Sequence, residues 1–120
     1  MNKIQELQLE LIKTWKFNMF DGEKVAADLI AHQELWRGAI TMKFYWTLLP
    51  LLGIDKGYWA VDTLYITPQP GREDELWKLA KTWYADDVHW VGGEEAGAEF
   101  FTNLPEIVNN PKVFLLVWWD

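Results

Sequence analysis

The sequence predicts an α/β (or α+β) fold in which two N-terminal helices precede a β-α-β-α-β unit with a small, mainly parallel sheet. Three observations lead to this prediction. Apolar residues recur every three or four positions near the N-terminus, as they do in amphipathic helices. Strand-like and helix-like segments then alternate, which is typical of parallel strands joined by crossover helices. Residues 113–119 are seven apolar residues in a row, so we expect the C-terminal strand to be central in the sheet.

The two N-terminal helices are predicted from their apolar stripes. The first helix should end near Asn18, and its stripe consists of Ile4, Leu7, Leu11 and Trp15. Asp21 is well placed as the N-cap of a second helix, and Glu23 puts an acid in its first turn. The core-facing residues expected in the second helix are Val25, Leu29, Ile30 and Trp36.

Residues 39–49 fit either a helix or a strand. Gly38 is a typical helix stop, and apolar and polar residues alternate over residues 40–48, as in a strand. However, the apolar stripe of the second helix continues through this segment at intervals of four. We favour a long second helix that bends at Gly38 and ends before Pro50, with the strand as the alternative.

The second half of the chain is expected to alternate strands and helices. Strands are predicted at residues 59–67, 87–91 and 113–119, a helix at residues 72–84, and a weaker helix from Glu94 to Leu104. The two connections between these strands are each about twenty residues long, which is enough for a crossover helix.

The composition indicates one soluble domain, residues 1–120. Half of the residues are hydrophobic, and most of the nine tryptophans are expected in the core. The chain has no cysteine, as is common in a reducing compartment. Its most apolar window, residues 39–54, is too short and too interrupted to span a bilayer. We therefore expect a cytoplasmic protein that does not associate with membranes.

The negative charge lies in the C-terminal half. The formal net charge is −7, and residues 61–120 hold eleven acidic but only four basic side chains. No lysine or arginine occurs between Lys81 and Lys112. Such a surface repels nucleic acid and attracts a cation, an amine or a basic protein surface.

Residues 86–99, DDVHWVGGEEAGAE, are the strongest candidate for chemistry. The two glycines lack the lysine and hydroxyl residues of a phosphate-binding loop, and the two glutamates that follow would satisfy the helix amides themselves. Asp87 and His89 should share one face of a strand, which gives two metal ligands at most without a contribution from Glu94 or Glu95. We predict no resident metal or other cofactor, and we expect the other histidine, His32, to be half-buried with a satisfied ring.

Residues 84–101, YADDVHWVGGEEAGAEFF, resemble the helix–strand–helix segment of the cone-shaped NTF2-like domains. In those domains the segment comes early and several long antiparallel strands follow it. Only one strand is expected to follow here, so no function is taken from the resemblance.

These observations favour a small acidic binding protein without catalysis, such as an adaptor, inhibitor or immunity protein, that engages a basic partner through its C-terminal half. The absence of both cysteine and serine supports this class, because it removes the commonest nucleophiles. The predicted binding residues are Asp86, Asp87, His89, Glu94, Glu95, Glu99, Trp119 and Asp120.

An acid–base enzyme is the alternative. It would act on a small molecule or use a metal, with a site around Asp87, His89 and Glu94 at the carboxyl edge of the sheet, where open α/β folds bind ligands. Asp120 would complete that site. A homodimer is also expected if the apolar residues 39–54 are not covered within one chain.

Overall fold

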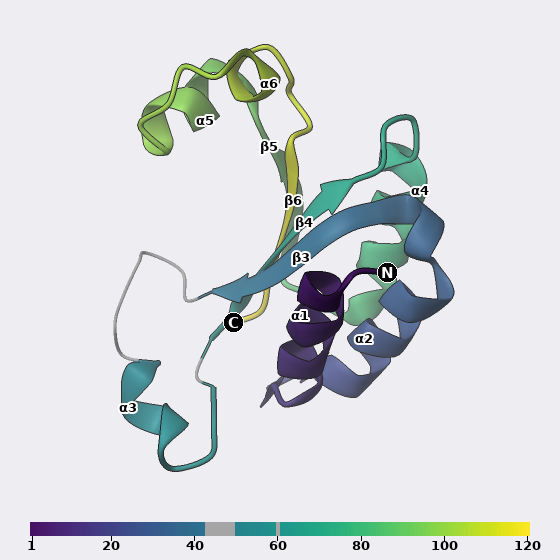
Figure 1. Ribbon diagram of the computed structural model, residues 1–120, viewed down its shortest axis with the longest axis vertical. Helices are drawn as coiled ribbons and strands as arrows, with labels where there is room; N and C mark the ends of the chain where they lie inside the picture. Colours follow the sequence, from purple (N-terminus) through teal and green to yellow (C-terminus); the bar gives the residue numbers. More distant parts are fainter. Residues whose placement is uncertain (43–49, 60) are drawn as a thin grey trace.

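The computed structural model describes residues 1–42, 50–59 and 61–120, which form an α+β fold (Figure 1). A four-stranded sheet has the order β3-β4-β6-β5, and a separate two-stranded hairpin joins β1 to β2. The strands are β1 (Lys16–Phe17), β2 (Phe20–Asp21), β3 (Trp36–Met42), β4 (Thr63–Pro68), β5 (Asp87–Val91) and β6 (Phe114–Trp118). The helices are α1 (Lys3–Lys13), α2 (Gly22–Ala31), α3 (Leu51–Ile54), α4 (Glu73–Ala80), α5 (Gly93–Glu99) and α6 (Pro105–Val108), with 3₁₀ turns at Gln33–Leu35 and Lys81–Trp83.

The prediction of a mainly parallel sheet after two N-terminal helices is wrong, because both sheets are antiparallel and helices occur throughout the described chain. Strand β6 pairs antiparallel with β4 on one side and with β5 on the other. Strands β4 and β5 therefore run in the same direction, as a crossover through α4 requires, but β6 separates them. Connection length alone allows either arrangement.

The favoured long second helix is also wrong. Helix α2 ends at Ala31, a 3₁₀ turn follows, and β3 begins at Trp36. Pairing with β4 stabilises the strand, and the alternation is visible in the burial of Ala39 and Thr41 around the exposed Ile40. This long-range pairing overrides the local helical stripe. The rest of that prediction, residues 43–49, lies outside the described residues.

The first helix is shorter than expected. Helix α1 ends at Lys13, and the β1–β2 hairpin occupies the segment up to Asp21, with Asn18 in the left-handed region at φ 51°. The predicted N-cap of the second helix is confirmed, because the Asp21 side chain accepts a hydrogen bond from the Lys24 backbone amide.

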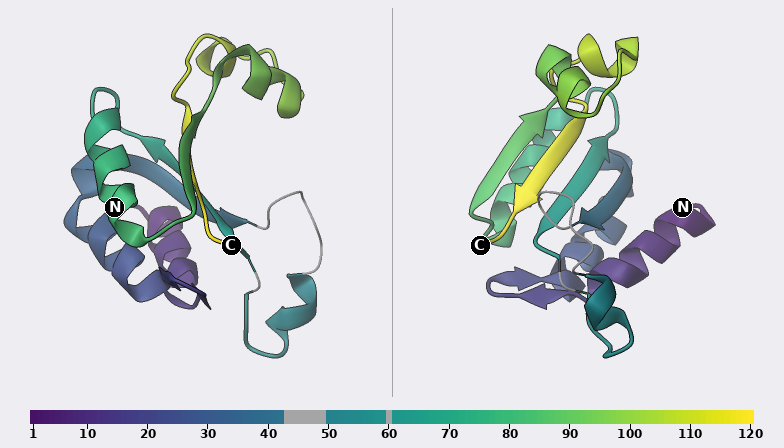
Figure 2. Two further views of the ribbon diagram at one scale, coloured as in Figure 1. Left: turned by 180° about the vertical axis from the view of Figure 1, so that it is seen from behind. Right: turned by 90° about the vertical axis from the view of Figure 1, so that its left-hand side faces the viewer.

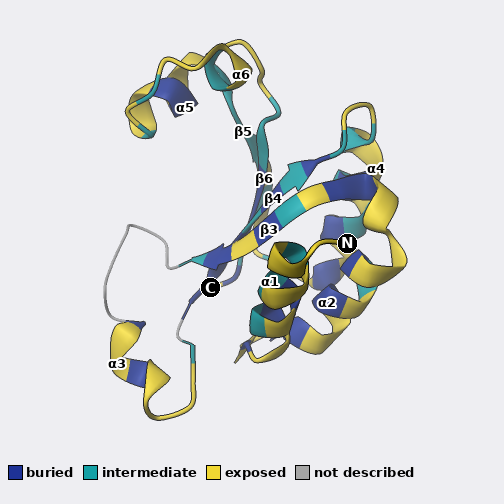
Figure 3. Cartoon of the chain, in the orientation of Figure 1, coloured by how far each residue is buried: buried dark blue, intermediate teal, exposed yellow. Residues whose placement is uncertain are grey.

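Helices α1, α2 and α4 cover one face of the sheet, whereas α5 and α6 lie beyond one end of β5 and β6 (Figure 2). The covered face buries Leu64 and Ile66 of β4 together with Leu115 and Val117 of β6. Figure 3 shows that buried residues concentrate in the sheet and in the helix sides that face it, while α5 and α6 are largely exposed. In the described part of the chain, no helix combines the length and the apolar character of a membrane span.

The opposite face of the sheet carries the alternate residues of each strand. Register places Ile40, Tyr65, Leu116 and His89 in one row across the four strands. Of these, Leu116 is buried, Tyr65 is half-buried, and the two edge residues are exposed. This open face therefore brings a phenol, an imidazole and apolar side chains to one surface.

Candidate functional site

The segment singled out in the sequence forms strand β5, a turn and helix α5. The amide of Gly93 donates to the Asn110 carbonyl oxygen at 2.8 Å, so it is not free to bind an anion. A Cβ atom added at Gly92 would lie 2.2 Å from the same oxygen, and Gly93 has a φ of 75°. The glycine pair therefore serves close backbone packing and a tight turn.

Asp87 and His89 lie on the open face, as predicted, and the His89 Nδ1 atom is 2.8 Å from an Asp87 carboxylate oxygen. Both side chains are half exposed, at 50 %. The described residues contain no group of three or more metal-ligating side chains that could hold an ion. Glu94, the third member of the predicted enzyme site, lies beyond the turn in the first turn of α5. The enzyme alternative remains a prediction.

The predicted acidic residues separate into two groups. Asp86 accepts a hydrogen bond from the backbone amide of Asp120 at 2.7 Å, and Asp87 pairs with Trp118 in the sheet register. These three carboxylates, which we call the acidic corner (Asp86, Asp87 and Asp120), lie at one end of β5 and β6. Glu94, Glu95 and Glu99 lie on α5 at the other end of β5 (Figure 1).

Trp119 belongs to the core and not to a surface site. Its side chain is fully buried, its ring packs edge-on against Phe20 and Trp15, and its Nε1 atom donates to the Trp83 carbonyl oxygen at 3.0 Å. Sequence reasoning placed it at the sheet edge because the direction of the side chain could not be known before the strand register.

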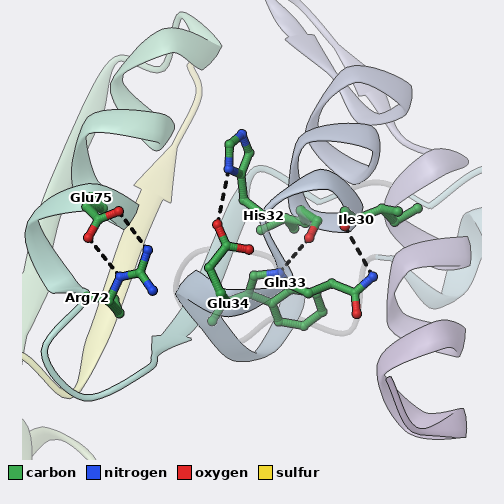
Figure 4. A network of polar contacts seen from close by, with 8 residues as sticks. Ile30, His32, Gln33, Glu34, Arg72 and Glu75 are labelled. Atoms are coloured by element: carbon green, nitrogen blue, oxygen red, sulfur yellow. Dashed lines mark hydrogen bonds and ion pairs between the residues drawn. The ribbon is translucent and has the colours of Figure 1, made fainter.

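His32 lies at the surface, where its Nδ1 atom is 3.5 Å from a Glu34 carboxylate oxygen (Figure 4). The neighbouring Arg72 binds Glu75 through two hydrogen bonds of 2.7 and 2.8 Å. The hydrogen bond from Arg72 lowers the pKa of the Glu75 carboxyl group. These exposed pairs contribute little to stability, since solvent screens them.

A groove that the sequence did not predict lies over the open face of the sheet at strand β3. Its volume is about 470 Å³, and its lining is almost entirely apolar. It is lined from α1, β3, β4, β6 and the α5–α6 segment by Ile4, Gln8, Gly38, Ala39, Ile40, Met42, Tyr65, Thr67, Phe100, Ile107 and Phe114. We call this feature the apolar groove. No local signal could have revealed it, because its walls come from segments up to 110 positions apart, from Ile4 to Phe114.

Two polar groups of the groove have unusual surroundings. The Gln8 Oε1 atom is buried and accepts no hydrogen bond from any described residue. Burial raises the pKa of the Tyr65 hydroxyl, and the negative charges of Glu99 and Asp62 raise it further. Glu99 thus acts on the groove although it was predicted as part of a general acidic surface.

The chain matches no model of a protein family, no curated protein and no solved structure. Its function therefore has to be inferred from its own residues.

Proposed function

We propose that the protein binds a small apolar molecule in the apolar groove, without catalysis. The observation that carries this proposal is the groove itself, whose volume of about 470 Å³ and apolar lining are those of a ligand site. Ligand pockets typically measure about 300–1,000 Å³ and combine apolar walls with a few polar groups. Here the polar groups are Gln8, Tyr65 and Thr67.

Aromatic and aliphatic side chains on both sides of the groove support the proposal. Phe100 packs edge-on against Phe114 with ring centroids 5.9 Å apart, and both line the groove. Ile40 lines it from the β3 side and is 45 % exposed. A ligand between them would remove this apolar surface from water, which is the main source of affinity in such sites.

Substitution of Ile40 by glutamine is expected to weaken binding of a neutral apolar dye such as Nile red about tenfold, equivalent to about 1.4 kcal/mol. The polar amide replaces apolar surface in the groove, while the edge position of β3 leaves the core intact. Dye fluorescence, titrated against the folded protein, measures the change.

Ile30→Gln is the matched control, because Ile30 is 40 % exposed but does not line the groove. Its dissociation constant for the dye should equal that of the unmodified protein. Equal weakening by both substitutions, or no saturable dye binding at all, would contradict the proposal.

A second candidate is the engagement of a basic protein surface, and the acidic corner favours it. Asp86, Asp87 and Asp120 are exposed, and the backbone amide of Asp120 binds Asp86. Their combined charge would attract lysine and arginine side chains and speed encounter with a basic partner. The exposed Leu51, Leu52 and Ile54 of α3 would similarly suit the predicted homodimer.

The acidic-corner proposal predicts salt-dependent binding of a lysine-rich peptide. An Asp86→Asn/Asp87→Asn variant should bind such a peptide several-fold more weakly at low salt, and the difference should shrink as salt screens the charges. Fluorescence anisotropy of a labelled peptide measures this. Equal affinity of that variant and a Glu6→Gln/Glu10→Gln variant, altered on α1, would exclude the acidic corner as the contact surface.

A further inference from the structure

We infer that a second cavity, between the β1–β2 hairpin and the segment that follows α3, binds a planar aromatic anion of one or two rings, such as an aromatic carboxylate. This site is separate from the apolar groove, so the inference does not depend on the proposed function. Three features of the cavity support it: aromatic walls that are already in place, a small volume, and a lysine that forms no ion pair with any described residue.

The cavity, which we call the aromatic pocket, is enclosed by the end of α1, strand β1 and the segment after α3, which lie at the same end of the molecule (Figures 1 and 2). Four of its seven lining residues are aromatic, namely Trp15, Phe17, Tyr58 and Trp59. Aromatic rings favour stacked or edge-on contacts with other rings. The walls therefore favour a flat aromatic molecule over a saturated one of the same size.

The aromatic walls are held in place without a ligand. Trp15 is buried in the hydrophobic core. The indole N–H of Trp59 donates to the Thr41 Oγ1 atom at 2.9 Å. The Tyr58 ring lies against Gly53, where an added Cβ atom would be 2.5 Å from it. A ligand that enters between fixed walls orders few side chains, which favours affinity.

The volume of the aromatic pocket limits the ligand to one or two rings. It is about 280 Å³, and an apolar cavity of about 150 Å³ holds one benzene molecule. Phe17 and Tyr58 are 37 % and 55 % exposed. A ring bound against them would remove part of this apolar surface from water, which contributes to affinity.

The charge in the aromatic pocket comes from Lys16, the only charged side chain among the described residues that line it. Lys16 forms no ion pair with any described carboxylate. Asp21, its partner in the hairpin register, instead accepts a hydrogen bond from the Lys24 backbone amide. A ligand carboxylate would give Lys16 a charge-assisted hydrogen bond, which is roughly twice as strong as a neutral one.

The net charge of −7 opposes this attraction only at longer range. Salt at physiological strength largely screens exposed charges that are more than about 8 Å apart, whereas the lysine would contact the ligand directly. The pocket is therefore expected to prefer an anion in spite of the acidic composition.

Isothermal titration calorimetry of the full chain with three molecules tests the ligand class: 2-naphthoate, its neutral analogue 2-naphthamide, and the saturated acid decahydro-2-naphthoate. We expect 2-naphthoate to bind most tightly. The amide should bind about tenfold more weakly because it lacks the charge, and the saturated acid about tenfold more weakly because it is not flat. Equal affinities for all three molecules, or no saturable binding of 2-naphthoate, would overturn the inference.

Matched variants assign the binding to the aromatic pocket, with circular dichroism to verify that each is folded. Lys16→Gln should weaken 2-naphthoate several-fold and leave 2-naphthamide unchanged, whereas Lys3→Gln on α1, outside the lining, should change neither. Phe17→Ala should weaken both aromatic molecules, unlike Met19→Ala in the same hairpin, since Met19 is exposed but does not line the pocket. Unchanged binding in Lys16→Gln, or a loss of 2-naphthoate binding in the groove variant Ile40→Gln, would refute this site.

Discussion

Replacement of Trp119 by alanine is expected to lower the free energy of unfolding by about 3–5 kcal/mol, the range found for large aromatic residues in cores. Its side chain is fully buried between Trp15 and Phe20, with ring centroids 5.8 and 4.3 Å away. The truncation would leave a cavity and an unpaired carbonyl oxygen on Trp83, which now accepts the indole N–H. The free energy of unfolding of a small domain is about 5–15 kcal/mol in total, so this one substitution removes a large part of the stability.

Urea unfolding followed by circular dichroism measures the effect, and two further variants locate its cause. Trp119→Phe keeps most of the ring but loses the hydrogen bond, so it should cost clearly less than Trp119→Ala. Trp77→Ala removes a tryptophan that is only partly buried against the core. A loss in Trp119→Ala no greater than that in Trp77→Ala would show that Trp119 does not anchor the core.

Substitution of Gly22 by alanine is expected to destabilise the protein by about 3 kcal/mol or more, at the upper end for overpacking. A Cβ atom at this position would lie 2.0 Å from the Ile12 carbonyl oxygen and 2.4 Å from that of Trp15. Both obstacles are backbone atoms, one in the last turn of α1 and one just after that helix, so α1 and α2 would have to separate. The Gly22 amide, which donates to the Trp15 carbonyl oxygen at 3.1 Å, would lose its position as well.

The sign of this effect distinguishes packing from helix propensity. If helix propensity alone decided the outcome, alanine would stabilise the helix by about 1 kcal/mol relative to glycine. Glu23→Ala, at the next and exposed position, should change stability by no more than about 0.5 kcal/mol. Chemical denaturation of both variants measures their free energies of unfolding. A Gly22→Ala protein that is more stable than the unmodified protein would refute the close approach of α1 and α2.

Several elements were predictable from the sequence because short-range interactions define them. The N-cap residue Asp21 and the apolar stripe that follows it predict the start of α2. Acidic residues in the first turn and a lysine in the last turn predict α4. The pattern of DVHWV predicts β5, which spans Asp87–Val91, and places Asp87 and His89 together on one face. Capping, helical spacing and strand alternation each act over a few residues, so the sequence reports them directly.

Only the tertiary structure decided the strand directions, the state of β3 and the position of the groove. The apolar stripe through Trp36 and Ile40 is compatible with a helix. These residues form a strand because they pair with β4, which lies more than twenty positions away in the sequence. Likewise, Glu99 raises the pKa of the Tyr65 hydroxyl, and Gln8 lines the same groove as Ile40 of β3, only because the chain returns to the same sheet several times. Local patterns encode which side of an element is apolar, but they do not encode which distant element will pack against it. The acidic surface was therefore readable from the sequence, whereas the apolar groove exists only in the folded chain.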